Sequence, residues 1–398
     1  MLRHLAICLA LASTTPAAAA PLIELTTAGK AVQGRQLASN KDECWLVDID
    51  GRLVQVKLAS VTAFRQVTPE FKSRPIQEVK KNLAAELGTG FEVAVRGGYV
   101  VAAPRGKADQ FAALFDQVSR EFLQYLRVRK FAIVDPDVPL VAIVFPTRDQ
   151  FLAQCAKDGV TPGAALRGYY HPHSNRVMLY DDPADNPTAG EPARSAGGRR
   201  TGGSRGPASM PSSHEANSGP IDSSTPACDT AVHEAIHQLA FNSGLHSRIG
   251  NNPLWVVEGL AMQFERGQDG YLKTRTSTRV NVPRIASWSS FQKDRQPQQG
   301  LSELIASDDS FRQSPVDTYS EAWLFTNYLI ETRARKFSWY LQTLATRNPL
   351  DPYPPEERLR DFQENFKEDM VWLEIEYVRY GEKVAAEALS ASELDKKR

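Results

Sequence analysis

The chain has 398 residues, of which 42% are hydrophobic and 9% aromatic, and its 47 Lys and Arg residues balance 47 Asp and Glu residues. This composition and length are typical of a folded protein of two or three domains. Zero net charge gives no electrostatic reason to expect a nucleic-acid partner. After residue 20, no stretch reaches the roughly eighteen apolar residues that would suggest a membrane-spanning helix.

Residues 1–20 are typical of a secretory signal peptide. Arg3 precedes a short apolar run, Leu5–Ala12, and the alanines of Ala17–Ala20 form a small-residue cleavage pattern. We therefore expect an exported protein, periplasmic or extracellular. We expect no stable membrane insertion once the signal peptide has been removed.

Three cysteines would remain in the mature chain: Cys44, Cys155 and Cys228. Export permits disulfides, but an odd number leaves at least one thiol without an intrachain partner. Cys155 with Cys228 is the pair to test, because that bond would anchor the chain just before the histidine motif described below. Three buried free thiols are the alternative.

Residues 21–72 predict a small β domain. Two strand patterns, Trp45–Ile49 and Leu53–Leu58, flank the dipeptide Asp50-Gly51, which is a strong hairpin signal. We expect a small SH3-like barrel. It would act either as a binding or docking module or as a packing appendage of the rest of the chain.

Residues 73–182 alternate between helical and strand patterns and predict a subdomain in which helices pack on a sheet. Val138–Phe145 is a continuous apolar strand, which indicates a sheet covered on both faces. The predicted elements are helices over 76–87, 111–126 and 151–156, strands over 91–94, 99–103 and 138–145, and a hairpin of 168–170 with 176–180. His171 and His173 fall at the hairpin tip, where polar residues are ordinary, so we do not expect them to bind metal.

The composition changes abruptly over residues 183–227 to Gly, Ser, Pro, Ala and Arg. Such a segment cannot bury enough apolar surface to fold, so we predict a disordered surface insertion. Its arginines do not alter the expectation that the protein has no nucleic-acid partner.

The motif H-E-x-x-H follows, with His233 and His237 one helical turn apart and Glu234 between them. On a helix, the two imidazoles share a face and can bind one metal ion. Glu234 points toward the same site and can take a proton from a water bound to that metal. The alternative is a buried helix whose histidines are merely satisfied by hydrogen bonds.

A third ligand is available from Glu258. Asn252-Pro253 predicts the start of a second helix, from Leu254 to about residue 266, that carries Glu258. Two histidines and one glutamate would leave a fourth position open, as catalytic zinc requires. His246 and Glu265 rank below Glu258, and for His246 the reason is that a third histidine ligand would be expected at position 243.

These residues resemble the gluzincin zinc metallopeptidases, the thermolysin-like group that holds zinc with two His and one Glu. The resemblance rests on H-E-x-x-H followed by Trp255-x-x-Glu258-Gly259-x-Ala261. From about Phe91 to the C-terminus, the chain is also similar to a family of secreted bacterial proteins of unknown function, DUF1570. One departure is Met262, at the position where thermolysin-like enzymes carry a carboxylate that supports a histidine.

The resemblance implies a zincin-like α+β domain with a mixed sheet, an active-site helix and, over 228–398, a helical C-terminal subdomain. It implies one zinc ion held by His233, His237 and Glu258, and a peptide or protein substrate. The last strand would run along the substrate cleft, so we expect Arg176–Tyr180 to offer a backbone edge to the substrate. A later tyrosine would stabilise the oxyanion, and Tyr319 is the candidate; a core position is its alternative.

The remaining sequence is mostly helical in pattern. We expect loop or short strands over Tyr271–Ser290, and a helix that opens at Tyr319. Further predicted helices cover 337–344, 356–366 and 368–386, before a frayed tail over 393–398.

The function predicted from the sequence is an exported zinc-dependent peptidase with Glu234 as general base. Two alternatives remain: a catalytically inactive zinc-binding pseudo-peptidase, and a cell-envelope binding protein that acts through its N-terminal domain.

Overall fold

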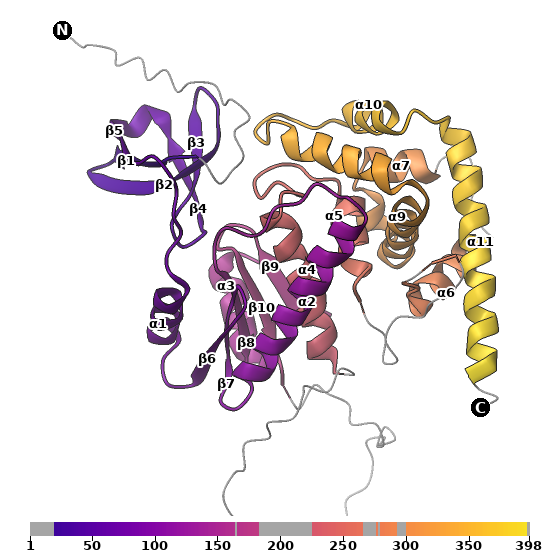
Figure 1. The fold of residues 1–398 in the computed structure, drawn as a ribbon, viewed down its shortest axis with the longest axis horizontal. Helices are drawn as coiled ribbons and strands as arrows, with labels where there is room; N and C mark the ends of the chain where they lie inside the picture. Colours follow the sequence, from indigo (N-terminus) through magenta and orange to yellow (C-terminus); the bar gives the residue numbers. More distant parts are fainter. Residues whose placement is uncertain are drawn as a thin grey trace, which may run out of the picture.

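The computed structural model of the protein describes residues 20–163, 165–182, 225–265, 276–277, 279–292 and 300–395. The predicted signal peptide up to residue 19, and residues 183–224 of the predicted insertion, lie outside these ranges. Two five-stranded sheets occupy the first half of the chain, and helices dominate the second half (Figure 1). The mixed α+β class predicted from the sequence is confirmed.

The N-terminal sheet is antiparallel, with strand order β4-β3-β2-β1-β5. Its elements are β1 (Leu22–Thr27), β2 (Lys30–Ser39), β3 (Glu43–Val47), β4 (Leu53–Lys57), the 3-10 turn η2 (Leu58–Ser60) and β5 (Val61–Thr68). Gly51 closes the predicted β3–β4 hairpin at a φ of 80°, a left-handed conformation that glycine adopts without steric cost. β1 pairs with both β2 and β5, so an N-terminal sheet is confirmed, and a separate domain with SH3-like closure stays a prediction.

This N-terminal sheet packs against the tip of the β9–β10 hairpin described below. The Leu53 N–H donates to the His173 carbonyl at 2.7 Å, and the Trp45 ring meets the His173 ring edge-on at 5.5 Å. Arg35 forms an ion pair with Asp137 of the second subdomain. The packing role is therefore present, whereas a binding role stays a hypothesis.

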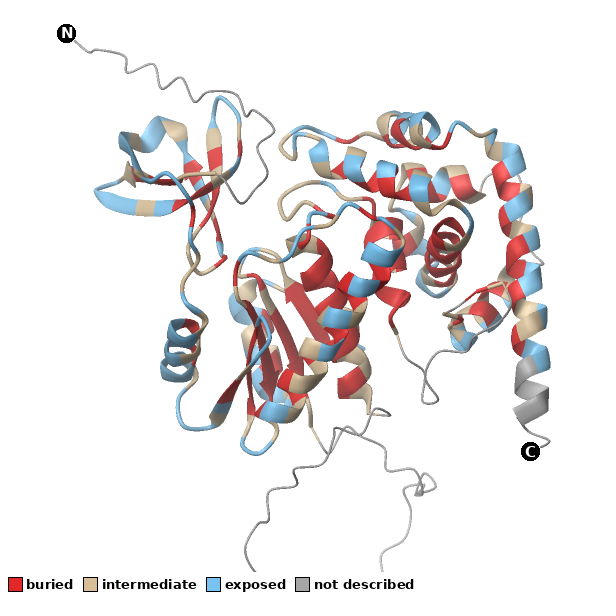
Figure 2. Ribbon diagram, viewed as in Figure 1, coloured by how far each residue is buried: buried red, intermediate tan, exposed pale blue. Residues whose placement is uncertain are grey.

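The second sheet is mixed, with strand order β6-β7-β8-β10-β9. Its strands are β6 (Phe91–Arg96), β7 (Tyr99–Pro104), β8 (Leu140–Phe145), β9 (Gly168–His171) and β10 (Arg176–Tyr180). Four helices cover it: α1 (Ile76–Leu87), α2 (Ala108–Val128), α3 (Arg148–Asp158) and α4 (Pro226–Asn242). α2 and α4 pack on one face, and α1 and α3 on the other, so every residue of β8 is buried (Figure 2). A sheet covered on both faces is confirmed.

The prediction that Arg176–Tyr180 offers a backbone edge to the substrate is wrong. β10 is internal, because it pairs in parallel with β8 on one side and antiparallel with β9 on the other. The two edge strands of the sheet are β6 and β9, so β9 is the member of this hairpin that lies at an edge. The sequence defines both strands of the hairpin but does not specify which of them pairs with β8.

The C-terminal half is a helical layer. Its described helices are α5 (Leu254–Met262), α6 (Val282–Phe291), α7 (Gly300–Ala306), α8 (Ser310–Gln313), α9 (Pro315–Thr346), α10 (Pro355–Phe366) and α11 (Met370–Asp395). The two helices predicted near 319 and over 337–344 form one element, α9, which kinks where Arg333 leaves helical dihedral angles. α5 ends at Met262, short of the predicted end near residue 266.

The prediction of loop or strand over Tyr271–Ser290 is wrong for the segment that becomes α6. Asn281 caps this helix by accepting the Arg284 N–H at 3.2 Å, and Pro283 lies in its first turn. Proline disrupts helices only in their interiors, and at the start its missing N–H costs nothing. Ile285 and Trp288 then form the buried face.

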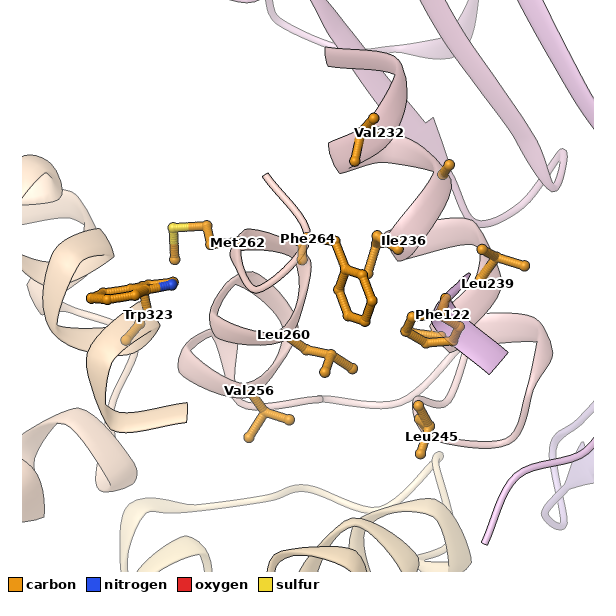
Figure 3. Close-up of a cluster of buried hydrophobic side chains, with 14 of the residues drawn as sticks. Phe122, Val232, Ile236, Leu239, Leu245, Val256, Leu260, Met262, Phe264 and Trp323 are labelled. Atoms are coloured by element: carbon orange, nitrogen blue, oxygen red, sulfur yellow. The ribbon is translucent and has the colours of Figure 1, made fainter. Parts of the chain in front are cut away.

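α5 lies in the largest core cluster, between α4 and α9. Leu260 and Phe264 lie among apolar side chains of α2 and α4, and Trp323 of α9 lies beyond them (Figure 3). Gly259 permits the close approach of α5 to α9, because a Cβ there would lie 2.1 Å from the Thr326 hydroxyl and 2.6 Å from the Ala322 carbonyl oxygen. The close packing of α5 on α9 therefore explains why glycine, and no larger residue, follows Glu258.

Cys44, Cys155 and Cys228 are all buried and free, so the Cys155–Cys228 disulfide considered from the sequence does not form. The alternative of three buried thiols is confirmed. Within the described residues, no helix is both long enough and apolar enough to cross a membrane.

Candidate metal centre

α4 places the H-E-x-x-H motif inside the molecule. The Thr225 side chain caps the helix by accepting the Cys228 N–H at 3.3 Å, and Pro226 occupies its first turn. α4 thus begins at Pro226, one residue before the predicted end of the insertion at residue 227. Val232, Ile236 and Leu239 pack into the core on one side (Figure 3), which leaves the histidines on another.

α5 brings Glu258 to the same place. Its first turn is fixed by Asp308, whose carboxylate accepts the Leu254 N–H at 2.9 Å and is itself paired with Arg358 at 2.9 Å. A carboxylate at a helix N-terminus satisfies an otherwise unpaired donor and interacts favourably with the helix dipole. Glu258 follows one turn later.

The three side chains predicted as ligands converge. The Nε2 atoms of His233 and His237 lie 3.0 Å apart. Glu258 places Oε2 3.4 Å from Nε2 of His233, and Oε1 3.7 Å from Nε2 of His237. One ligand atom from each residue lies within 4.8 Å of the others, so the triad could hold a metal ion. Among the described residues, this is the one group of three or more His, Cys, Asp or Glu side chains that are placed to hold a metal ion.

The charges of the triad are strongly coupled. Burial opposes ionisation of Glu258, but His237 and His233 outweigh this effect and hold the pKa of the carboxyl below its usual range. Burial also opposes protonation of His233, and here the hydrogen bonds to Glu258 and Glu265 outweigh it and raise the pKa of the imidazole well above its usual value. The site therefore favours positive charge, which suits a cation.

Glu265 is the outer partner of His233. Its Oε1 lies 3.0 Å from Nδ1 of His233, the ring nitrogen that faces away from the triad. Glu265 in turn accepts a hydrogen bond from Asn281 at 3.0 Å and pairs with Arg284 at 3.5 Å. It is thus not a rival metal ligand. It supplies the histidine-supporting carboxylate that the sequence lacks at Met262, and it fixes which nitrogen of His233 can bind metal.

Replacing Glu265 with Leu is expected to weaken the binding of a divalent metal ion, tested with zinc, by about 10- to 100-fold, because the ring of His233 loses its orienting acceptor. Competition against a chromophoric chelator measures the affinity. Glu86→Leu removes a carboxylate that pairs with Arg176 at 2.6 Å, away from the triad, and serves as the control. Equal affinities of the two variants would contradict the role given to Glu265.

Glu234 stands beside the ligands but is not one of them. It is buried, and its Oε2 accepts the backbone N–H of Tyr170 at 2.7 Å. The Tyr170 N–H was not anticipated, because nothing local in the sequence indicates contact between β9 and α4. Its bond to Oε2 leaves Oε1 for another partner.

Tyr319 lies one turn inside α9, which begins at Pro315 rather than at Tyr319 as predicted. Its ring meets that of Phe311 edge-on at 5.2 Å. The Arg284 guanidinium lies over the Tyr319 ring, 5.8 Å from the ring centroid. Burial, together with the charge of Glu258, raises the pKa of Tyr319 to about 12. The side chain is half-buried and packs against the main core cluster.

The other histidines that the structure describes, His171, His173 and His246, stay outside the triad. His246 is buried, and both of its ring nitrogens lack a hydrogen-bond partner among the residues that the structure describes. Burial and the nearby charge of His237 lower the pKa of His246 to about 3. At the hairpin tip, His171 Nδ1 lies 3.0 Å from the Ser174 hydroxyl, and the His171 ring lies 5.9 Å from that of His173 in a tilted arrangement.

The comparison with protein families finds one match, over residues 227–351, to a family described as a protein of unknown function, DUF1570. The resemblance to DUF1570 is thereby supported. The matched segment runs from α4 past the end of α9 and contains the whole triad, Glu265 and Tyr319. The DUF1570 match covers less than half of the chain, and no curated protein matches the chain.

Proposed function

We propose that the protein is an exported zinc-dependent peptidase of the gluzincin type, with a zincin-like catalytic domain. The observation that carries the proposal is the convergence of His233, His237 and Glu258 beside a carboxylate, Glu234, that is not needed for metal binding. Two imidazoles and one carboxylate are the ligand set of catalytic zinc in several peptidases. A site that only stored zinc would not require Glu234.

The donor set fits zinc. The hydrogen bond between Glu265 and Nδ1 of His233 leaves Nε2 of His233 as the free donor nitrogen, and Nε2 of His237 lies 3.0 Å from it. A zinc ion, when bound there, would supply Lewis acidity to a water molecule and to a carbonyl oxygen.

Glu234 carries the proton in the proposed mechanism. Because Tyr170 N–H occupies Oε2, Oε1 is free to take a proton from the attacking water. After the peptide bond has been attacked, the same carboxyl group would give that proton to the leaving amine. Tyr319 would donate a hydrogen bond to the oxyanion that develops on the carbonyl.

β9 is the strand that would align the substrate. The carbonyls at the two ends of β9 are directed to β10. The Arg167 C=O, just before the strand, accepts the Tyr180 N–H, and the His171 C=O, at its end, accepts the Asn175 N–H. Backbone groups alternate in direction along a strand, so those of Gly168 and Tyr170 point to the edge of the sheet. Glu234 takes the Tyr170 N–H there, which leaves the Tyr170 carbonyl for a substrate. An extended peptide could add to this edge as a further strand.

The metal content of the purified mature protein tests the proposal first. We expect about one zinc per chain after dialysis, lost in Glu258→Ala, followed by cleavage of members of a peptide library. Zinc without cleavage of any peptide would support a pseudo-peptidase. Absence of zinc would overturn the metal site and would favour a binding protein that acts through its N-terminal domain.

A further inference from the structure

We propose that Asn175 and Asn242 are positioning residues for the general base. Their paired side-chain amides hold strand β9 so that its Tyr170 N–H stays bound to Glu234. The inference rests on the proposed function, because it assigns Glu234 the role of proton acceptor. It assigns a role to two residues that bind neither metal nor substrate.

α4 presents two separate rows of side chains. His233 and His237 form the first row and are two of the three members of the triad. The second row meets the β9–β10 hairpin, which lies beside α4 (Figure 1). Its residues recur at every fourth position and so share a helix face. They are Thr230, Glu234, Gln238 and Asn242. One helix therefore couples metal binding on one face to strand placement on the next.

The row meets the hairpin at successive points. Gly168 lies so close to Thr230 that a Cβ on the glycine would come within 2.6 Å of the threonine methyl group. Glu234 accepts the Tyr170 N–H at 2.7 Å, and Gln238 donates to the Asn175 carbonyl at 2.7 Å. These contacts fix the hairpin along the length of α4.

The amide pair closes the far end of this row. Asn242 Nδ2 donates to Asn175 Oδ1 at 2.7 Å, and Asn175 Nδ2 donates back to Asn242 Oδ1 at 3.0 Å. Asn175 Oδ1 also accepts the Tyr170 hydroxyl at 2.8 Å. The residue whose N–H binds the general base is thus tied to the amide pair through its own side chain.

The network is specific because Asn175 and Tyr170, to which the half-buried Asn242 is tied, are buried. Asn175 is 2% exposed, in the left-handed conformation at φ 57°, and Tyr170 is 8% exposed. Buried amides that lose their partners cost stability, so a shifted hairpin would leave several of them unsatisfied. Asn175 also tolerates the left-handed conformation better than most residues. The network therefore favours one register of β9 on α4.

Hydrogen exchange at the Tyr170 amide tests this role without any substrate. An outward-facing N–H on an edge strand exchanges rapidly unless something binds it, and here Glu234 is the acceptor. Asn242→Ala, loaded with zinc, is expected to exchange this amide about tenfold faster or more than the wild type, with unchanged zinc content. The triad keeps its zinc because its ligands come from the other row of α4 and from α5.

Asn365→Ala is the matched control. Asn365 is also half-buried, donates to the carbonyl four residues before it at 2.8 Å, and bonds to Thr343 of another helix at 3.0 Å. For Asn242 the corresponding bond to the Gln238 carbonyl is 2.7 Å. The control should leave exchange at Tyr170 unchanged. Wild-type exchange at Tyr170 in Asn242→Ala would overturn the inference.

Tyr170→Phe carries the test if Asn242→Ala does not fold. It removes the hydroxyl, and with it the bond to Asn175 and the contacts of that hydroxyl with Asn242 and Arg248, and keeps the ring packed on Phe241 at 5.4 Å. We expect faster exchange at residue 170, and exchange equal to wild type would again overturn the inference. Because this readout needs no turnover, it judges the amide pair even if the wild type cleaves no peptide.

For a cleaved peptide, Asn242→Ala is expected to lower kcat by about 10- to 100-fold, because Glu234 loses the Tyr170 N–H that orients its carboxylate. KM is free to change as well, because β9 is also the proposed substrate edge. Asn365→Ala should change neither constant. A loss confined to KM would overturn the assignment of Asn242 to the general base.

Discussion

Glu234→Gln is expected to lower the rate of peptide hydrolysis by about 10²- to 10⁴-fold, the range that general acid–base catalysis contributes. Glutamine retains the shape of the side chain and an oxygen that can accept the Tyr170 N–H, but it cannot take a proton from water. Zinc content should be unchanged, because Glu234 is not among the three converging ligands. Turnover with zinc-loaded protein and elemental analysis measure the two effects.

A second glutamate provides the control for this substitution. Glu92 also accepts a backbone N–H through Oε2, from Gly106 at 2.9 Å, and lies at β6, at the opposite side of the sheet from β9. Glu92→Gln should retain both zinc and turnover. Turnover retained in Glu234→Gln would refute the general-base assignment while leaving the metal site intact.

Trp255→Ala is expected to lower the free energy of unfolding by about 3–5 kcal/mol, the usual cost of truncating a large buried aromatic side chain. Trp255 is 0% exposed. Its ring lies 5.0 Å from that of Phe325, 5.9 Å from that of Tyr340 and 6.2 Å from that of Phe362. Denaturant unfolding measures the loss.

The same substitution should weaken zinc binding, because Trp255 holds α5 against α9 and Glu258 lies one turn further along α5. Trp372→Ala removes a tryptophan that is 63% exposed and should change stability by no more than about 0.5 kcal/mol. If Trp255→Ala lost stability but bound zinc normally, the position of Glu258 would not depend on this core.

The local pattern of the sequence was sufficient for many elements. The helix predicted over 76–87 has those bounds as α1, and the apolar run that ends at Phe145 forms the fully buried strand β8. Both follow from side-chain periodicity, which depends only on neighbours within a few turns or a few strand residues. Pro283 shows the limit of such patterns, since a proline fits both a loop and the first turn of α6.

For the site, the sequence alone determined the three candidate ligands, and the structure brings them together. The spacing of His233 and His237 fixes their common face on any helix, and the motif around Glu258 supplied the third ligand. The tertiary structure decided the partners of these residues. Glu265 reaches His233, and the Tyr170 N–H reaches Glu234 across 64 positions of sequence.

The tertiary structure also decided that β9 rather than β10 lies at an edge of the sheet, and that three cysteines stay apart in separate places. Strand order and such partners depend on pairings between segments far apart in the chain. Periodicity says which face of an element is buried, but it carries no information about which distant element will cover that face.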